Sequence, residues 1–263
     1  MKTFIFSDVH GNRFGLEAVL AYTNGHYDNA LCLGDVVGYG AHPNECCELV
    51  RETIAASPHG ACLLGNHDAA ALGIIDASWF NDVAFQAITW TGDELSEENK
   101  AWLHSLRATF SSADVGLADI PFEAVHGSLR EPLEEYITEP TIAYHTVKLM
   151  TTELCFYGHT HVARAWALGE SKRGLFRRTP NLQQADLREG GLVSLEAGVK
   201  VLLNPGSCGQ PRDGNSKARA AIWDSEAATI EVFQVDYDCE AARVAIYEAG
   251  LPGVLGDRLM IGR

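Results

Sequence analysis

The chain has 263 residues, of which 46% are hydrophobic and 21% are charged. This composition supports a buried core and excludes an intrinsically disordered chain. The formal net charge of −15 argues against a surface that coats nucleic acid and against a partner that is an anionic membrane.

Several features of the sequence favour a cytoplasmic protein. The first predicted strand begins at Lys2, with no charged and apolar leader before it. No apolar run reaches the roughly 18 to 20 residues needed to span a bilayer. The seven cysteines are an odd number and include no CxxC pair, which is typical of a protein in a reducing compartment.

The first part of the chain alternates predicted strands with predicted helices. Strands are expected at residues 2–7, 30–33 and 61–64. Between the first two, Leu16 and Val19 have the spacing of a helix that covers one face of a sheet. Pro43 suits the first turn of a second helix. Such alternation predicts parallel strands that are joined by crossover helices.

The middle and the end of the chain follow other patterns. A helical insert over about residues 69–118 interrupts the alternation and is expected to cap a cleft. Further elements are a strand near 122–125, a helix near 141–152, a strand at 154–157, and short strands at 162–168, 201–203, 220–223 and 230–235. Residues 169–198 are predicted to form a loop or hairpin. We expect a single domain over residues 1–263 with two packed sheets.

Five short polar motifs each follow directly on an apolar run. They are Asp8-Val9-His10, Gly34-Asp35, Gly65-Asn66-His67-Asp68, His126-Gly127 and Gly158-His159-Thr160-His161. The carboxyl ends of buried strands meet at one edge of a sheet, where ligands bind in open α/β folds. The motifs therefore predict that carboxylate, imidazole and amide groups gather around metal ions.

The types of residue indicate the ions and the chemistry. Asp8 and His10 are two residues apart, so in regular strand geometry both side chains would reach one ion. Asp35 is suited to bridge two ions with its two oxygens. Nitrogen and oxygen ligands without thiolate favour Mn²⁺, Fe, Zn²⁺, Ni²⁺ or Co²⁺ over Ca²⁺ and Mg²⁺. Two such ions fit phosphoester hydrolysis, in which a metal-bound hydroxide attacks phosphorus and a general acid protonates the leaving group.

In this order the motifs resemble those of the calcineurin-like metallophosphoesterases, over residues 4 to about 212. The resemblance implies an α/β fold, a four-layer α/β/β/α sandwich with two mixed sheets. It also implies two divalent transition-metal ions, with Mn²⁺ favoured for activity. It assigns His67 to the leaving group or a phosphate oxygen, and Asp68 to orienting His67. The implied ligands are Asp8, His10 and His161 for one ion, Asn66, His126 and His159 for the other, and Asp35 between them.

Two local features refine the resemblance. The segments 8–12 and 204–212 resemble the small bacterial phosphodiesterase-like members. The Asp-Arg-Gly of the protein Ser/Thr phosphatases is missing after Gly34-Asp35, which argues against a phosphoprotein substrate. Asn12 and Arg13 open the first helix beside the site, where a helix N-terminus favours anions. Together with Arg212 they are candidate substrate contacts, although each also has a purely structural interpretation.

The sequence therefore predicts a dimetal phosphoesterase, most simply a phosphodiesterase that acts on a small phosphorylated substrate such as a nucleotide. One alternative is a pyrophosphohydrolase of nucleotides or dinucleoside polyphosphates, which needs an additional cationic or aromatic groove beside the metals. A non-catalytic scaffold with the same fold is the least favoured alternative, because the ligand set is complete. A homo-oligomer fits an acidic enzyme of this size, but no segment demands one.

Overall fold

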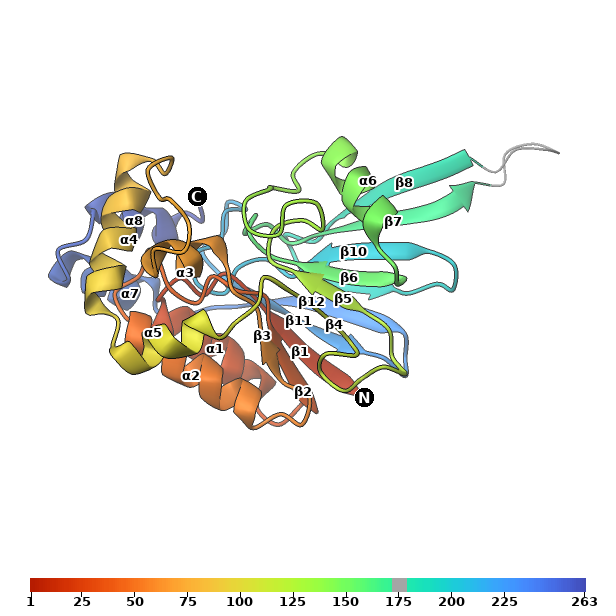
Figure 1. The fold of residues 1–263 in the computed structure, drawn as a ribbon, viewed down its shortest axis with the longest axis horizontal. Helices are drawn as coiled ribbons and strands as arrows, with labels where there is room; N and C mark the ends of the chain where they lie inside the picture. The colour runs from red at the N-terminus through yellow and green to blue at the C-terminus, as the bar shows by residue number, and fades with distance from the viewer. Residues whose placement is uncertain (172–178) are drawn as a thin grey trace.

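The structure of the protein, a computed structural model, describes residues 1–171 and 179–263. Two mixed six-stranded sheets pack against each other (Figure 1). The first sheet has the strand order β3-β2-β1-β11-β12-β9. Its strands are β1 (Lys2–Phe6), β2 (Asn29–Cys32), β3 (Ala61–Cys62), β9 (Gly191–Ser194), β11 (Ala218–Asp224) and β12 (Thr229–Val235).

The second sheet has the order β4-β5-β6-β10-β7-β8. Its strands are β4 (Thr109–Ser111), β5 (Glu123–Val125), β6 (Leu154–Tyr157), β7 (Arg164–Ser171), β8 (Thr179–Asp186) and β10 (Lys200–Asn204). Strands β1, β2 and β3 run parallel in the first sheet, as do β5, β6 and β10 in the second. The remaining pairs in both sheets are antiparallel.

The apolar core lies in three layers that alternate with the sheets. Between the two sheets, Leu31 and Ile5 of the first pack in one cluster with Phe156 of the second. Helices α1 (Arg13–Thr23) and α2 (Pro43–Ala55) cover the outer face of the first sheet, and α6 (Pro140–Leu149) covers the second. Full burial of each large apolar side chain contributes about 1.5–3 kcal/mol. The expected four-layer sandwich is confirmed.

The helix starts follow ordinary capping rules. The Asn12 side chain accepts a hydrogen bond from the Gly15 amide and caps α1, and Pro43 occupies the first turn of α2. The predicted insert contains α4 (Asp82–Glu94) and α5 (Glu97–His104), and Ser96 caps α5. Helix α3 (Asn66–Ala71) begins before the insert, at the third polar motif. Residues 109–118 hold β4 and a loop instead of further helix.

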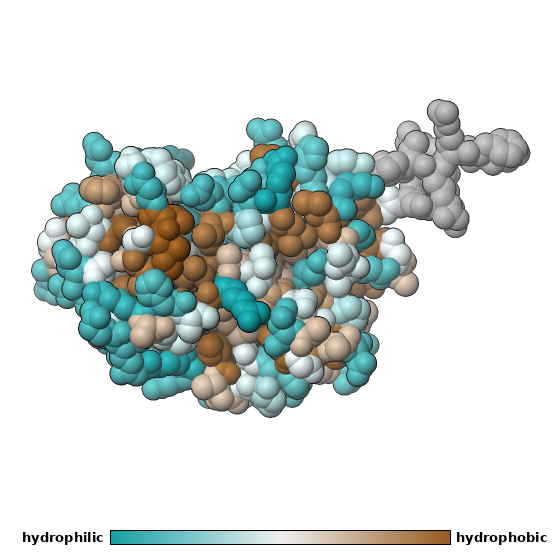
Figure 2. Space-filling model, in the orientation of Figure 1, coloured by the Kyte–Doolittle hydropathy of each residue, from teal (hydrophilic) through white to brown (hydrophobic). Residues whose placement is uncertain are grey.

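The C-terminal helices lie outside the predicted elements. The chain ends in α7 (Cys239–Glu248), α8 (Gly253–Asp257) and the short helix η1 (Arg258–Met260), for which we predicted no element. These helices pack on α4 (Figure 1), where Ala87, Ile246 and Leu255 share one apolar cluster. Figure 2 shows an apolar surface patch over α3 and α4.

The predicted loop or hairpin at residues 169–198 contains the antiparallel pair β7 and β8, followed by β9. Its residues 172–178 lie outside the described part of the chain. Within the described residues, the helices are too short or too polar to cross a bilayer.

Candidate metal centre

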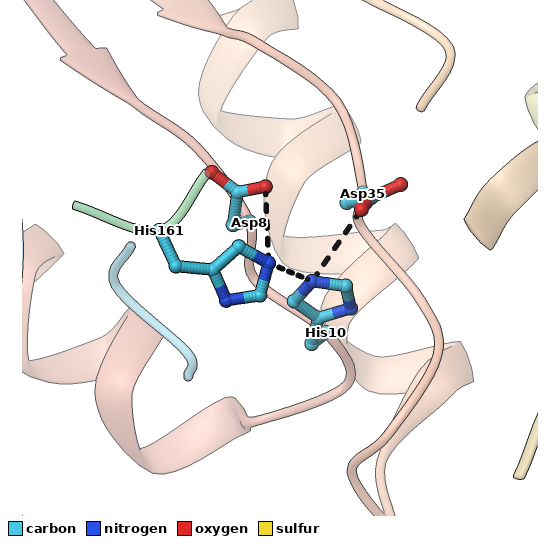
Figure 3. Close-up of side chains that lie close together, drawn as sticks. All are labelled: Asp8, His10, Asp35 and His161. Carbon is cyan, nitrogen blue, oxygen red and sulfur yellow. Dashed lines mark hydrogen bonds and ion pairs between the residues drawn. The ribbon is translucent and has the colours of Figure 1, made fainter. Parts of the chain in front are cut away.

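Asp8, His10, Asp35 and His161 form one cluster of buried polar side chains (Figure 3). They follow the carboxyl ends of β1, β2 and β6, so both sheets contribute. The Nε2 atoms of His10 and His161 lie 2.9 Å apart. Asp8 Oδ1 is 3.5 Å from Nε2 of His161, and Asp35 Oδ2 is 3.4 Å from Nε2 of His10. Four potential ligand atoms thus converge on one point.

A second cluster shares Asp35 with the first. It contains Asp35, His126 and His159. Nε2 of His126 is 3.4 Å from Asp35 Oδ2 and 3.1 Å from Asn66 Oδ1. The same carboxylate oxygen therefore faces one imidazole from each cluster. This is the arrangement in which one carboxylate can bridge two cations.

Hydrogen bonds to main-chain oxygens fix the tautomers of several imidazoles. Nδ1–H of His126 donates to the Leu33 carbonyl at 2.7 Å, and Nδ1–H of His161 donates to the Gln210 carbonyl at 2.6 Å. Because a carbonyl can only accept, each Nδ1 carries a proton, and Nε2 is the ring atom that points into the cluster. Nε2–H of His159 donates to the Glu134 carbonyl at 3.3 Å, which leaves Nδ1 as its free nitrogen.

The backbone at the ligand positions is unusual. Among the described residues, six that are not glycine have positive φ, and five of these are Asp8, His10, Asp35, His159 and His161. Left-handed backbone at such residues is uncommon and concentrates at functional sites. It also corrects the geometry behind one prediction. Asp8 and His10 reach the same cluster through left-handed turns after β1 ends at Phe6, and not through strand alternation.

Gly65 is required by the close approach of two loops. A Cβ at this position would lie 2.1 Å from Oδ1 and 2.2 Å from the main-chain nitrogen of Asp35. Oδ1 of Asp35 already accepts a hydrogen bond of 2.8 Å from the His67 amide. The glycine therefore allows the loop after β3 to hold Asp35 in place.

Unpaired buried atoms show that the cluster suits cations. In the described part of the chain, Oδ2 of both Asp8 and Asp35 is buried without a hydrogen-bond partner. A buried carboxylate oxygen without compensation is costly, and a divalent cation would supply that compensation. The mixed nitrogen and oxygen donors fit a transition metal. The residues present therefore fit a pair of metal ions.

The electrostatics agree with this conclusion. Burial raises the pKa of Asp8 to about 7, and repulsion from Asp35 adds to the effect. Burial lowers the pKa of His159 to about 3 and holds the pKa values of His10 and His161 well below their usual range. These imidazoles are thus neutral, with lone pairs available to a metal. His126 differs, because burial is outweighed by attraction to Asp35, which raises its pKa to about 9. A metal ion at Nε2 would displace the second proton of this imidazole.

Comparison with known proteins identifies the family. The calcineurin-like phosphoesterase superfamily domain matches residues 1–227. The chain belongs to the calcineurin-like phosphoesterases. An uncharacterized protein of Methanocaldococcus jannaschii is 36% identical over 262 residues, which cover 98% of this chain and 97% of that protein.

Solved structures give the same result. A metallophosphoesterase from Sphaerobacter thermophilus has a TM-score of 0.81 and 34% identity, with all of both chains covered. A hypothetical protein from Pyrococcus horikoshii has a TM-score of 0.76 and 18% identity, over 100% of this chain and 98% of that one, and shares the fold.

Two predicted substrate contacts, Asn12 and Arg13, have partners within the protein. Both polar atoms of the Asn12 amide are used, because Nδ2 donates to the Gly209 carbonyl at 2.7 Å while Oδ1 caps α1. Arg13 pairs with Glu17 at 3.4 Å on the same helix. The side-chain amide of Asn12 therefore has a structural role at the start of α1.

Asp68 also differs from its predicted role. Its Oδ1 accepts from the Val37 amide and its Oδ2 from the Gly65 amide, both at 2.9 Å. It therefore braces the loops after β2 and β3 and does not contact the His67 ring. Nδ1 of His67 is buried without a hydrogen-bond partner in the described residues. The His67 ring lies 4.7 Å from the His10 ring, beside the first metal cluster.

Arg212 does lie at the phosphoesterase site. It donates to Oε1 of Gln210 at 3.0 Å and to the Tyr39 hydroxyl at 3.3 Å. Together with burial, its charge lowers the pKa of His67 to about 4. The next residue, Asp213, forms a fully buried ion pair with Arg219, which anchors the loop that carries Arg212.

Two aromatic residues at the site are not among the residues predicted from the sequence. The Tyr39 ring lies 4.4 Å from the His67 ring, and the Tyr136 ring stacks on His159 at 3.7 Å. Tyr39 lies four residues after Asp35, so its position near the site could have been predicted from the sequence. Tyr136 lies in a loop after β5 with no pattern that marks it.

Proposed function

We propose that this protein is a dimetal phosphodiesterase that hydrolyses small phosphorylated substrates, with Mn²⁺ as the favoured ion. The observation that carries the proposal is Asp35 Oδ2, which lies 3.4 Å from one imidazole of each cluster. A bridging carboxylate is the feature that a two-metal phosphoesterase needs and that a site for a single ion does not. When bound, the metal pair supplies an activated water and a clamp for the phosphate oxygens.

The protein's own residues have distinct roles in this proposal. Asp8, His10 and His161 hold one ion, Asn66, His126 and His159 hold the other, and Asp35 is shared. Arg212 binds a phosphoryl oxygen of the substrate, at or next to the metal centre, with its guanidinium group. His67 faces the leaving group and donates a proton to it. An anionic substrate favours the protonated imidazole, which counteracts the burial that lowers the pKa of His67.

Removal of metal tests the proposal most directly. Elemental analysis of the purified protein should find about two transition-metal ions per chain, since two ligand clusters are present. Treatment with a chelator should abolish hydrolysis of bis(p-nitrophenyl) phosphate, and added Mn²⁺ should restore it. A protein that holds no divalent ion and stays inactive with Mn²⁺ would instead support the scaffold alternative.

The substitution His67→Ala tests the general acid. The variant should keep both metals, because the His67 amide that contacts Asp35 belongs to the backbone. Hydrolysis of phenyl-type diesters, whose leaving groups are poor, should slow by about 100-fold or more. Hydrolysis of p-nitrophenyl diesters should change much less, because that leaving group needs little protonation. Equal rates of parent and variant with phenyl-type diesters would contradict the assignment.

A pyrophosphohydrolase remains the second candidate because the site has the cationic and aromatic surroundings that it requires. Arg212, Tyr39 and Tyr136 all lie beside the metal ligands. A panel of cyclic nucleotides, model diesters, phosphomonoesters and dinucleoside polyphosphates would separate the two candidates. We also propose a cytoplasmic location, which the seven free cysteines support.

A further inference from the structure

A second arginine, like Arg212, lies close to the Tyr39 ring at the edge of the metal centre. The guanidinium carbon of Arg258 is 5.9 Å from the centre of the Tyr39 ring, and that of Arg212 is 5.7 Å from the same point. The Tyr39 ring in turn lies 4.7 Å from the His10 ring. Tyr39 thus lies close both to two cationic side chains and to a residue that would hold a metal.

Arg258 belongs to a segment outside the family's common domain. The family match ends at residue 227, whereas Arg258 begins η1. Its neighbours Leu255 and Leu259 are 1% and 2% exposed, and they pack in one cluster with Tyr39 and α4. The C-terminal helices therefore fix Arg258 firmly at the site, and they give this chain a contact that the domain alone would lack.

Within the described residues, neither arginine forms an ion pair with an aspartate or glutamate side chain. Arg212 donates to a phenol and an amide, and Nε of Arg258 donates to the main-chain oxygen of Arg263. Other arginines of this acidic chain, such as Arg188 and Arg243, pair with aspartates. Burial lowers the pKa of Arg258, and repulsion from Arg212 lowers it further. Nε of Arg212 is also buried without a partner.

We propose that Arg258 and Arg212 bind a second phosphoryl group of the substrate, beside the phosphate at the metal centre. Two guanidinium groups that flank the same tyrosine ring and lack an aspartate or glutamate partner match the charge and the planar geometry of phosphate recognition. An anion held between them would also offset their mutual repulsion. The inference rests on the proposed phosphoesterase function and specifies its substrate as one that carries two phosphoryl groups.

The test compares two substrates that differ only in a second phosphate. They are thymidine 5′-(p-nitrophenyl phosphate) and its 3′-phosphorylated form, with the same scissile bond and the same chromophore. Arg258→Gln should raise the KM of the doubly phosphorylated compound by at least about tenfold and that of the singly phosphorylated compound by less than about threefold. Arg258→Lys, which keeps the charge but loses the fork, should give an intermediate KM.

A matched control removes the same charge elsewhere. Arg107 has a side chain that is 78% exposed and lies 3.8 Å from Asp114. Arg107→Gln should leave both KM values unchanged, since an exposed ion pair of this kind contributes little. Thermal unfolding of all variants would identify a loss of fold, and Arg258→Lys keeps the test informative if Arg258→Gln is unstable.

Binding measurements separate failure of this inference from failure of the proposed function. Calorimetric titration of thymidine 5′-phosphate and thymidine 3′,5′-bisphosphate needs no turnover. Tighter binding of the bisphosphate that depends on Arg258 supports the inference, even if the protein hydrolyses neither chromogenic compound. Hydrolysis of both compounds with no selective effect of Arg258→Gln overturns the inference and leaves the phosphoesterase function intact. An equal loss with both compounds also overturns it, because it indicates a structural role.

Discussion

Asp35→Asn should reduce the bound metal from about two ions per chain to one or none, and activity should fall by more than about 100-fold. The two side chains have nearly the same shape, and Oδ1 can still accept from the His67 amide as it does in the parent. At the Oδ2 position, however, the amide presents N–H donors to the imidazoles of His10 and His126. A bridging anion is thus replaced by a neutral group that repels cations.

Metal content by elemental analysis and hydrolysis of bis(p-nitrophenyl) phosphate would measure both effects. Asp93→Asn is the matched control, because Asp93 is exposed on α4 and the change removes the same charge. The control should keep two ions and the parent's activity. Retention of two ions with more than half of the activity in Asp35→Asn would show that this carboxylate is not shared.

Arg219→Met should destabilise the protein by about 3–5 kcal/mol, because it leaves the carboxylate of Asp213 buried and without its partner. For a chain of this size, the melting temperature should fall by roughly 6–15 °C. The change should also raise the KM for phosphate esters, since Asp213 follows Arg212 directly. Differential scanning calorimetry and steady-state kinetics would measure the two consequences separately.

A double variant distinguishes a missing partner from lost packing. Arg219→Met combined with Asp213→Leu removes both charges and should regain much of the stability, as replacement of buried ion pairs by apolar residues often does. Arg243→Met is a comparison at a partly exposed ion pair with Asp257 and should cost less than about 1 kcal/mol. A melting temperature of Arg219→Met equal to that of the parent would refute the role of this pair.

The site was predictable to the extent that its residues lie close together in sequence and follow apolar runs. The predicted ligand motifs all lie at the carboxyl ends of strands, because burial of the strands leaves the next residues at one edge. The strand at Leu154–Tyr157 has the predicted bounds. The four-layer arrangement came from the resemblance of the motifs, since strand patterns alone do not determine the order of strands in a sheet.

Other parts of the site depend on contacts between distant segments. Arg258 lies more than 200 positions from Tyr39 in the sequence, and no local pattern connects them. We predicted a substrate contact for Asn12 and a role in orienting His67 for Asp68, because the sequence shows a polar group but not its hydrogen-bond partners. In the structure, the Gly209 carbonyl and the Val37 and Gly65 amides occupy these side chains. The left-handed turns at Asp8 and His10 could not be predicted from the spacing of residues, because that reasoning assumes regular strand geometry.

Because the ligands come from both sheets, metal binding should stabilise the packing of the two sheets against each other. Asp8, Asp35 and Asn66 belong to one half of the sandwich, whereas His126 and His161 belong to the other. A bound metal pair would therefore link the two sheets. When the free metal concentration is a hundred times the dissociation constant, each ion stabilises the folded protein by about 2.7 kcal/mol. Loss of the ions would remove this contribution and leave the buried carboxylates of Asp8 and Asp35 uncompensated, so metal supply would affect the stability of the protein as well as its rate of catalysis.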